Sequence, residues 1–354
     1  MRAASKPFLC LLALLVGAEL VVRVFFARSM AGRFDYGYHP TAGFVERADG
    51  TVRLERAGGR RFFPQSFSRE RPTNTFRIFV IGDSVARGTS VESSYAGQLG
   101  EQLRARGVKA ESFNLSVPGF GARRKQLVLE QALRYQPSLV ILHVNDSNEY
   151  EDEREWRRRE EFRGWHPRNW LMKSLAIRRL YELKQEKVYW EWLPASVRNQ
   201  RAVSDADAEI KASLNPEKVR QWTELVQKVT GETISAARKQ NVRVLLVSQA
   251  TADLKAVSAT PDDHGLDALC GAMLSEGVGV VSMKDSLTGR EAKVVYSDGS
   301  HLLTAGHKVL AESIVRELDR VAWLPPQPGK RSEEHTLNSS HLGIFVCRLL
   351  LEKK

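Results

Sequence analysis

The chain has 354 residues, of which 42% are hydrophobic and 27% are charged. This length and composition suit one large α/β domain or two small ones, and they exclude a low-complexity chain and a multi-span membrane protein. Three cysteines, Cys10, Cys270 and Cys347, exclude a disulfide framework and a cysteine-based zinc cluster. The formal net charge of +11 permits attraction to an anionic surface, but no recognisable nucleic-acid-binding module accompanies it.

The first 30 residues predict an export signal or a single membrane anchor. An apolar run over residues 8–26 has only two charged interruptions, and two basic residues, Arg2 and Lys6, precede it. A short basic start followed by an apolar stretch at the N-terminus is typical of such segments. We therefore expect an exported domain, with residues 1–30 as its signal or anchor and a membrane as a partner through this segment.

The two charges inside the apolar run are spaced for a helix. Glu19 and Arg23 lie four residues apart, so on a helix they share a face and can pair near the membrane interface. A cleavage site is conceivable after Ala31. The sequence thus leaves two locations open: a membrane-anchored protein facing the extracytoplasmic side or, after cleavage, a secreted one.

The last residues, 331–354, resemble a translated sequencing adapter in the string RSEEHTLNSSH. We expect them to be a non-native tail that takes no part in the fold. The tail carries four basic and three acidic residues, so without it the formal charge falls from +11 to +10, and Cys347 is lost. With Cys10 in the N-terminal segment, only Cys270 remains in the exported domain, which then needs no oxidant to fold.

Residues 31–74 are predicted to form a connector between the N-terminal segment and the folded domain, which we assign to residues 75–330. The connector is rich in Arg, Gly and Pro and shows little apolar periodicity. A short hairpin is expected within it around Asp49 and Gly50, because this dipeptide favours a tight turn.

From residue 75 onward, short aliphatic runs alternate with helical patterns. The aliphatic runs are typical of strands buried on both faces of a parallel sheet and cover residues 76–82, 138–144 and 242–248. The helical patterns cover residues 95–103, 123–135, 216–239 and 304–321. This alternation predicts an α/β fold with a central parallel sheet.

A helical insertion rich in Trp and Arg interrupts this pattern over residues 150–214. It holds five of the seven tryptophans of the chain: Trp156, Trp165, Trp170, Trp190 and Trp192. Four interpretations remain open from the sequence: a cap that buries its aromatic side chains against the sheet, a lid over the site, a sugar-stacking platform, or a surface that lies on an anionic membrane.

A serine follows the first predicted strand directly. The sequence Gly82-Asp83-Ser84 places Ser84 at the carboxyl edge of a buried strand, where open α/β sheets build their sites. A serine there can expose its hydroxyl and point its own N–H into the site, although Gly-Asp-Ser also forms ordinary turns. Ser84 is therefore the candidate nucleophile.

Three further elements place polar groups near the same edge. The stretch from Asn114 to Gly119 follows the second candidate strand and ends in a glycine whose backbone can approach a ligand closely. Asn145 ends the third strand and offers a side-chain amide donor. Asp298 and His301 lie three residues apart, so the carboxylate can hold the imidazole and stabilise the imidazolium that forms when it takes the serine proton.

In this order, the four elements resemble those of the SGNH hydrolases, also called the GDSL esterase/lipase family, over about residues 75–323. The resemblance implies a three-layer α/β/α, flavodoxin-like fold. It also implies a serine nucleophile, a final Asp-x-x-His, and an oxyanion hole built from the serine N–H, a glycine N–H and an asparagine side chain. Carried to this chain, the catalytic residues are Ser84, Asp298 and His301, and the oxyanion-hole residues are Ser84, Gly119 and Asn145.

Two positions depart from the family's pattern. Val85 stands where a leucine usually follows Gly-Asp-Ser, which is a mild change. His143 stands where a glycine usually precedes the asparagine by two residues, so a bulky polar group is expected near the oxyanion hole. Because side chains alternate along a strand, His143 and Asn145 are predicted to share a face. We expect His143, which does not belong to the triad, to alter either substrate access or the geometry of the oxyanion hole.

Other titratable residues are weaker candidates. His307 lies in the first turns of the last predicted helix and is interpreted as a packing or capping residue, and His264 has no serine partner by pattern. Asp146 and Glu149 lack the spacing of known metal sites. No glycine-rich phosphate loop or dinucleotide fingerprint occurs. We therefore expect no metal and no cofactor.

The sequence thus predicts a serine hydrolase of small-molecule or glycan esters, an acyl or acetyl esterase. If a sugar hydroxyl accepts the acyl group, the same residues make an O-acyltransferase acting on envelope or secreted polysaccharide. A non-catalytic carbohydrate-binding protein on the same fold is the third hypothesis, and the complete Ser, Asp and His set argues against it. We expect no nucleic-acid ligand and infer no obligate protein partner.

Overall fold

A five-stranded parallel sheet forms the centre of the computed structural model, which describes residues 5–27, 43–54, 56–57, 60–146, 148–185 and 192–325. Its strand order is β10-β9-β8-β6-β7, and every neighbouring pair is parallel. The first strand in the chain therefore lies between the second and the third, as in flavodoxin-like folds. The strands are β6 Phe76–Ile81, β7 Ala110–Asn114, β8 Leu139–Val144, β9 Arg243–Ser248 and β10 Val278–Ser282.

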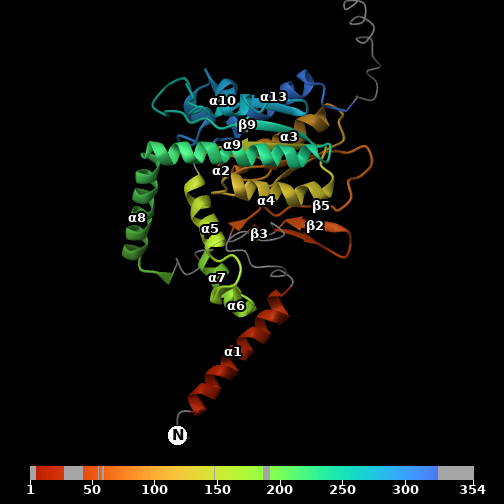
Figure 1. Ribbon diagram of the computed structural model, residues 1–354. Helices are drawn as coiled ribbons and strands as arrows, with labels where there is room; N and C mark the ends of the chain where they lie inside the picture. Colours follow the sequence, from red (N-terminus) through yellow and green to blue (C-terminus); the bar gives the residue numbers. More distant parts are fainter. Residues whose placement is uncertain are drawn as a thin grey trace, which may run out of the picture.

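Helices cover both faces of this sheet (Figure 1), which confirms the predicted α/β fold. One face carries α3 (Tyr95–Ala105) and α13 (Thr304–Arg320), and the other carries α4 (Ala122–Ala132) and α9 (Pro216–Arg238). All four helices agree with the predicted helical patterns. Shorter helical segments complete the domain: α2 Ser84–Arg87, the 3-10 turn Leu133–Tyr135, α10 Leu266–Gly271, α11 Met283–Leu287 and α12 Ala292–Val295.

The two faces of the sheet make two separate hydrophobic cores. Along β6, Phe79 and Ile81 enter the core beneath α4 and α9, whereas Ile78 and Val80 enter the core beneath α3 and α13. Successive side chains of a strand point to opposite faces, so a strand covered on both sides must be apolar throughout. This requirement explains why the strands appear in the sequence as uninterrupted aliphatic runs.

The prediction of a simple connector over residues 31–74 is wrong for residues 43–68, which form a three-stranded sheet of β1 (Phe44–Glu46), β2 (Thr51–Leu54) and β5 (Ser66–Ser68). The hairpin predicted at Asp49 and Gly50 joins β1 and β2, and Gly50 has a φ of 77°. Two-residue strands, β3 (Arg56–Ala57) and β4 (Arg60–Arg61), form a second small sheet.

Aromatic side chains attach this three-stranded sheet to the domain. Phe44 stacks on Tyr135 with ring centroids 5.4 Å apart, and Phe67 lies 5.3 Å from both Tyr135 and Phe79. The segment belongs to the core beneath α4 and α9 although its sequence lacks regular apolar spacing. Its apolar residues are too far apart along the chain for a periodic pattern, because each strand has only three or four residues.

The insertion runs from the domain toward the N-terminal helix α1 (Ser5–Phe26), as Figure 1 shows. It consists of four helices: α5 Glu149–Glu161, α6 Pro167–Leu171, α7 Leu175–Gln185 and α8 Ala195–Ser213. It does not bury its aromatic side chains as a cap against the sheet, because the exposed fractions of Trp165, Trp170 and Trp192 are 95%, 70% and 81%. Trp190 lies outside the described residues.

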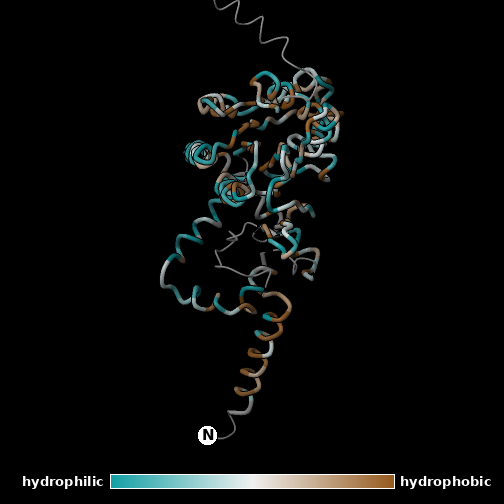
Figure 2. The backbone as a smooth tube through the Cα atoms, turned by 90° about the vertical axis from the view of Figure 1, so that its right-hand side faces the viewer, coloured by the Kyte–Doolittle hydropathy of each residue, from teal (hydrophilic) through white to brown (hydrophobic). Residues whose placement is uncertain are grey.

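Helix α1 is the apolar helix that the N-terminal sequence predicts, and its hydrophobic residues dominate it in Figure 2. Among the described residues it is the one helix long and apolar enough to cross a membrane, over Pro7–Phe26 with a mean hydropathy of 2.4. The predicted pair of Glu19 and Arg23 forms, with 2.8 Å between Oε1 and Nη2. The cleavage position after Ala31 and the tail 331–354, with Cys347, lie outside the described residues.

The backbone before Ser84 leaves no room for a side chain at residue 82. A Cβ atom on Gly82 would lie 2.4 Å from the Cβ of Ala86 and 2.8 Å from the Cβ of His143. Because both neighbours are buried and cannot move away easily, Gly82→Ala is expected to reduce the free energy of unfolding by about 1–3 kcal/mol. Chemical denaturation measures this change.

Gly231 provides the matched control for this prediction. It lies inside α9, and a Cβ there would meet nothing within 4 Å. Gly231→Ala is expected to stabilise the protein by about 0.5–1 kcal/mol, since alanine favours a helix interior. Equal free energies of unfolding for the two variants would contradict the crowding inferred at Gly82.

Candidate active site

The candidate nucleophile Ser84 is the first residue of α2 and follows β6 directly. Asp83 caps this short helix, because its Oδ1 accepts hydrogen bonds from the N–H groups of Val85 (3.0 Å) and Ala86 (3.4 Å). The cap turns the chain sharply at the strand end and leaves Ser84 half-buried while Asp83 is buried. The serine hydroxyl therefore stands at the carboxyl edge of the sheet.

His301 and Asp298 meet Ser84 at this edge, although more than two hundred residues separate them from it in the chain. The Nε2 of His301 lies 2.9 Å from the Oγ of Ser84, and the Nδ1 of His301 lies 2.9 Å from Oδ2 of Asp298. The exposed fractions of the His301 and Asp298 side chains are 43% and 57%, so solvent and substrate can reach them. The structure thus brings together the three residues that the sequence predicts as a triad.

A closed turn holds Asp298 and His301 in this geometry. Tyr296 and Leu302 form an antiparallel bridge at its base, and the Ser297 N–H donates to the His301 carbonyl. The Asp298 Oδ1 accepts the N–H groups of Ser300 and His301, each at 2.8 Å. Partial burial acts to raise the pKa of Asp298, but these hydrogen bonds and the imidazole outweigh it and hold the pKa below its ordinary value. The carboxylate beside the imidazole is therefore ionised.

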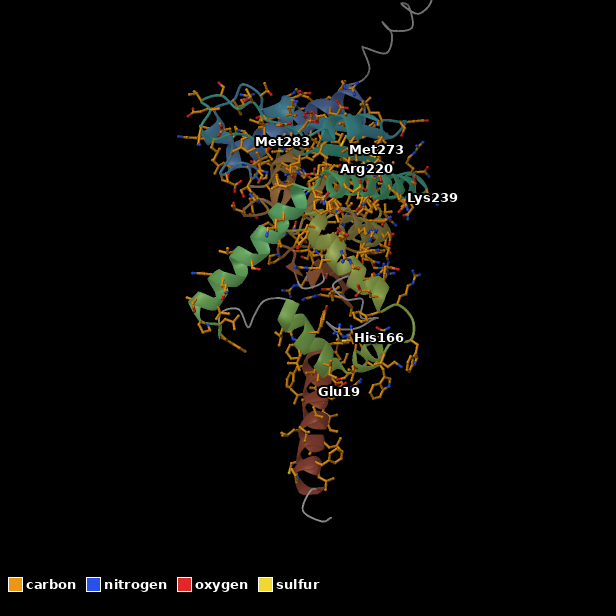
Figure 3. The ribbon with its side chains drawn as sticks, turned by 60° about the vertical axis from the view of Figure 1, so that its left-hand side comes forward. Glu19, His166, Arg220, Lys239, Met273 and Met283 are labelled. Carbon is orange, nitrogen blue, oxygen red and sulfur yellow. The ribbon has the colours of Figure 1, made fainter. Side chains whose placement is uncertain are left out.

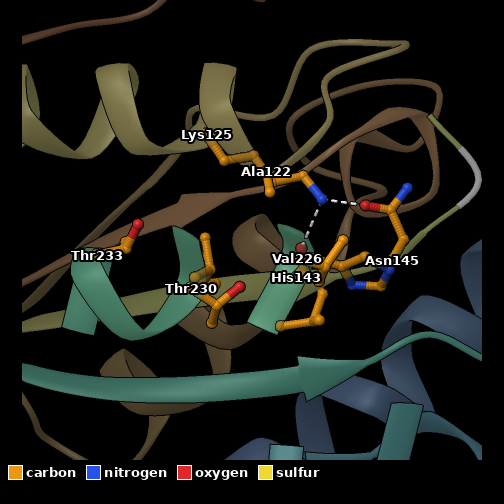
Figure 4. Close-up of a pocket in the computed structure, with 9 residues that line it drawn as sticks. Ala122, Lys125, His143, Asn145, Val226, Thr230 and Thr233 are labelled. Carbon is orange, nitrogen blue, oxygen red and sulfur yellow. Dashed lines mark hydrogen bonds between the residues drawn. The ribbon is translucent and has the colours of Figure 1, made fainter. Parts of the chain in front are cut away.

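Asn145 is held between the buried Lys125, which Figure 4 shows, and the buried carboxylate of Asp83. The Nζ of Lys125 donates to Oδ1 of Asn145 and, at 2.9 Å, to the carbonyl of His143. On the other side, Nδ2 of Asn145 donates to Oδ2 of Asp83 at 2.6 Å. An ammonium group can only donate and a carboxylate can only accept, so these neighbours fix which end of the amide is the donor. The donor end faces the residue that precedes Ser84.

Lys125 was not predicted from the sequence, although the sequence carries a signal for it. It lies on α4 in line with Ala122, Leu129 and Ala132, which are all buried, so a lysine occupies the apolar face of the helix. Burial lowers its pKa, while the nearby carboxylates of Asp83, Glu149, Asp152 and Asp146 act to raise it. A lysine placed this way is a polar partner for another buried group rather than a surface charge.

Behind Asn145 lies a small internal cavity between α4, β8 and α9, with roughly the space of one water molecule. It is lined by Ala122, Lys125, residues 142–145, Val226, Thr230 and Thr233. Ser84, Asp298 and His301 do not line it. The cavity is therefore separate from the triad, and it is polar only where Lys125 meets the end of β8 and at the two threonines.

Asn148 is a second side chain that the sequence analysis missed. Its Nδ2 donates to Oδ2 of Asp83 at 2.9 Å, the same oxygen that accepts Asn145. Asn114 also supports the nucleophile turn, because its Nδ2 donates to the carbonyl of Arg87 at 3.0 Å at the end of α2. Asn114 is the last residue of β7 and Asn148 follows the end of β8, and these positions were the available signal.

Gly119 lies in the loop after β7, as predicted, with a φ of 70° that favours glycine. The same loop runs beside the nucleophile turn, because the Val117 N–H donates to the Gly82 carbonyl at 3.0 Å. The carbonyl of Gly119 accepts a hydrogen bond from Arg124 at 3.3 Å. These bonds connect the loop to the start of α4 and to the strand end that carries Ser84.

The expectation that His143 influences substrate access is wrong, because its side chain is fully buried. The ring stacks on that of Tyr95 with centroids 6.2 Å apart, and Nδ1 lies 3.5 Å from the Tyr95 hydroxyl. Burial lowers the pKa of His143 to about 4, and Lys125 adds to this effect while Asp83 opposes it. His143 is thus a neutral packing residue beneath the site.

The other weaker candidates have structural partners. His307 accepts the Tyr95 N–H at 3.3 Å at the start of α3, which confirms it as a capping residue. His264 lies 3.0 Å from the Thr251 hydroxyl. Glu149 accepts the N–H of Ala122, the first residue of α4, at 2.7 Å.

Asp152 joins Glu149 at the start of α4, where Gly121 provides no side-chain cap. Its Oδ2 accepts the Arg124 N–H at 3.3 Å, and its Oδ1 pairs with the Arg124 guanidinium at 3.1 Å. Burial raises the pKa of both carboxyl groups, and Arg124 opposes the rise for Asp152. These two residues of α5 therefore anchor the start of the insertion beside the candidate site.

No protein-family model and no curated protein matches the chain. Among solved structures it is similar to TesA, with 13% identity and a TM-score of 0.42 over 69% of this chain and 99% of TesA. It is also similar to an acetyl xylan esterase, AlAXEase, with 14% identity and a TM-score of 0.40 over 68% and 98% of the two chains. A member of the lipolytic G-D-S-L family from Veillonella parvula DSM 2008 has 12% identity and a TM-score of 0.39, over 69% and 98%.

The buried histidines make stability depend on pH. Burial lowers the pKa of His143 and His307 to about 4 in the folded protein, whereas an unfolded histidine titrates near 6.5. The unfolded state therefore binds more protons between these values, and stability is lost as the pH falls from about 6.5 toward about 4. We expect up to about 1.4 kcal/mol of loss per pH unit for each histidine. Denaturant unfolding at a series of pH values measures it.

His307→Asn should weaken this pH dependence, because an asparagine oxygen can still accept the Tyr95 N–H but does not titrate. His264→Asn is the matched control: His264 is exposed and has a φ of 49°, which asparagine tolerates. The control should keep the dependence of the wild type. The same slope in all three proteins would show that His307 does not contribute.

Proposed function

We propose that the chain is a serine hydrolase of ester bonds, of the SGNH type. The observation that carries the proposal is the hydrogen-bonded series Ser84 Oγ, His301, Asp298 at the carboxyl edge of β6. A serine hydroxyl is a weak nucleophile until an adjacent base takes its proton, and a carboxylate on the far side of the imidazole fixes the tautomer that can do so. The contacts of His301 with Ser84 and with Asp298 support both conditions.

In the proposed reaction, the Oγ of Ser84 attacks the ester carbonyl while Nε2 of His301 takes its proton. The imidazolium that forms keeps its Nδ1–H on Asp298, whose ionised state stabilises the positive charge. His301 then returns the proton to the leaving alkoxide, and the ester C–O bond breaks to give an acyl group on Ser84. A water molecule, deprotonated by His301, releases the acid and restores the serine.

The negative oxygen of the tetrahedral intermediate requires donors beside Ser84. We assign these to the N–H of Ser84, the N–H of Gly119 and the Nδ2 of Asn145. The Nδ2 of Asn145 donates to Oδ2 of Asp83, which holds this amide beside the residue that precedes Ser84. Donors that are fixed before the reaction stabilise the intermediate without reorganisation, and losing one typically costs about 10²–10³ in rate.

An O-acyltransferase uses the same acyl-enzyme with a sugar hydroxyl in place of water. The acceptor separates the two reactions: with p-nitrophenyl acetate as the donor, hydrolysis gives free acetate, whereas transfer gives an acetylated glycan. No contact among the described residues favours the glycan acceptor, so hydrolysis is the proposed reaction.

Labelling with a fluorophosphonate probe tests the nucleophile. The activated serine is expected to form a covalent adduct, which mass spectrometry of peptides should locate on Ser84. Ser84→Ala should abolish labelling while leaving the thermal unfolding temperature unchanged within about 2 °C, because a half-buried hydroxyl is a small loss. Ser300→Ala is the matched control, since Ser300 also lies in the site but forms part of the Asp298 turn; it should still label. An adduct on another residue would refute the assignment.

The role of Lys125 can be separated from its contribution to folding by a double-mutant cycle with Asn145. Asn145→Ala should lower kcat by about 10²–10³ with little change in KM, as expected for an interaction made mainly in the transition state. Lys125→Met should lower kcat by about tenfold or more, because Asn145 then loses the donor that orients it. If Lys125 acts through Asn145, the double variant should be no slower than Asn145→Ala alone.

Asn215→Ala is the control for this cycle, since Asn215 caps α9 on the surface and has no contact with the triad. It should lose some stability and keep kcat. Fully additive effects of Lys125→Met and Asn145→Ala would mean that Lys125 supports the fold independently of Asn145.

A further inference from the structure

A carboxylate of α1 caps the third helix of the insertion. Glu19 accepts hydrogen bonds from the Ser174 hydroxyl (2.7 Å), the Leu175 N–H (3.0 Å) and the Ala176 N–H (3.0 Å), all at the start of α7. A carboxylate at a helix N-terminus satisfies N–H groups that have no partner within the helix and interacts favourably with the helix dipole. The apolar helix is therefore fixed against the insertion.

The position of Glu19 along α1 determines how far the insertion reaches down this helix. Seven residues separate Glu19 from Phe26, so the start of α7 lies about 10 Å below the end of α1, measured along its axis. The Arg179 guanidinium of α7 lies 5.1 Å from the centre of the Phe26 ring, which places α7 beside the last turns of α1. Figure 3 shows His166 of the insertion above Glu19 of α1, on the side that faces the domain.

The segment around this contact, residues 162–181, which we call the elbow, has an unusual composition. It contains no acidic residue, and its exposed basic residues are Arg163, Arg168 and Lys173, whereas Arg179 is half-buried and Arg178 is buried. Three of its large apolar side chains are mostly exposed, with exposed fractions of 95% for Trp165, 70% for Trp170 and 67% for Leu180. Tryptophan with arginine and lysine on exposed positions is the composition of segments that lie at a membrane surface.

We infer that the elbow is a membrane-binding platform that lies in the headgroup region of an anionic bilayer, beside a retained α1. One bilayer would cover both the apolar surface of α1 and the exposed side chains of the elbow. No residue of the apolar window of α1 is fully buried by protein, and only the positions 17, 19 and 22 are half-buried. Because α7 starts at the level of Glu19, any bilayer that encloses α1 up to Phe26 also reaches the elbow. The exposed Arg163, Arg168 and Lys173 would then meet lipid phosphates, and the tryptophans would lie at the interface.

The contact between α1 and α7 also favours a retained anchor over a cleaved signal. Removal of α1 would leave the N–H groups of Leu175 and Ala176 without the carboxylate that caps them and would expose the face of α7 that packs on α1. The proposed membrane-binding platform does not depend on the proposed hydrolase activity, because none of its residues touches Ser84, His301 or Asp298.

Tryptophan fluorescence of the full chain tests the platform. The protein is reconstituted into nanodiscs of zwitterionic and anionic lipid that carry bromine either near the headgroup or near the chain ends. Because α1 contains no tryptophan, quenching by bromine reports on the rest of the chain. We expect stronger quenching from bromine near the headgroup than from bromine near the chain ends. We also expect the double variant Trp165→Phe, Trp170→Phe to reduce the quenched emission about twofold or more.

The matched control is the double variant Trp222→Phe, Trp323→Phe, which removes two buried tryptophans of the domain and should leave the quenched emission unchanged. Glu19→Ala should reduce quenching in the same direction as the elbow variant, because it releases α7 from α1. The N-terminus of the protein isolated from cell membranes should lie before Phe8.

Three results would overturn the inference. The first is equal quenching in the wild type and the elbow variant. The second is protection of Trp165 and Trp170 from aqueous acrylamide without quenching by the lipid, which would mean that a second copy or a glycan covers them. The third is a mature N-terminus beyond Phe26.

Discussion

The carboxylate of Asp83 joins the two strand ends from which the candidate site is built. One oxygen caps the helix that begins with Ser84, and the other accepts the side-chain amides of Asn145 and Asn148, which follow the neighbouring strand β8. A carboxylate has acceptors only, so all of these donors must point toward it. The position of the nucleophile and that of the amide donor are thereby fixed relative to one buried group, and not by two independent loops.

The negative charge of the buried Asp83 carboxylate needs a positive charge nearby. Lys125 supplies part of that positive charge from the opposite side of Asn145. Replacing buried ionic groups by apolar ones often costs no stability, so the value of such an arrangement lies in the single geometry that it imposes. Here that geometry concerns the amide of Asn145, whose oxygen accepts from Lys125 and whose nitrogen donates to Asp83. The turn that holds Asp298 completes the site, because its His301 reaches Ser84 from the far end of the chain.

The elements that could be predicted from the sequence are those set by local patterns. The aliphatic runs of β6, β8 and β9, the asparagine and proline that begin α9, and the residues that follow the strand ends all carry their signal within a few positions. The contacts that could not be predicted join distant segments. Phe44 and Phe67 pack against Tyr135, which lies about seventy or more residues away in the chain. His143 lies in β8, but this strand ends at Val144, so Asn145 does not continue it as predicted. The ring of His143 packs on Tyr95 of α3, a contact between distant segments that buries it beneath the site.

Two contacts of the insertion are of the same kind, a carboxyl group that accepts N–H groups at a helix N-terminus. At the start of the insertion, Glu149 and Asp152 of α5 accept N–H groups of α4, the helix that carries Lys125. At its third helix, Glu19 of α1 accepts the N–H groups of Leu175 and Ala176 in α7. The first N–H groups of a helix have no partner within that helix, so each contact satisfies donors that would otherwise need water. The insertion is therefore joined at its start to the helix that positions Asn145, and at its third helix to the apolar helix α1.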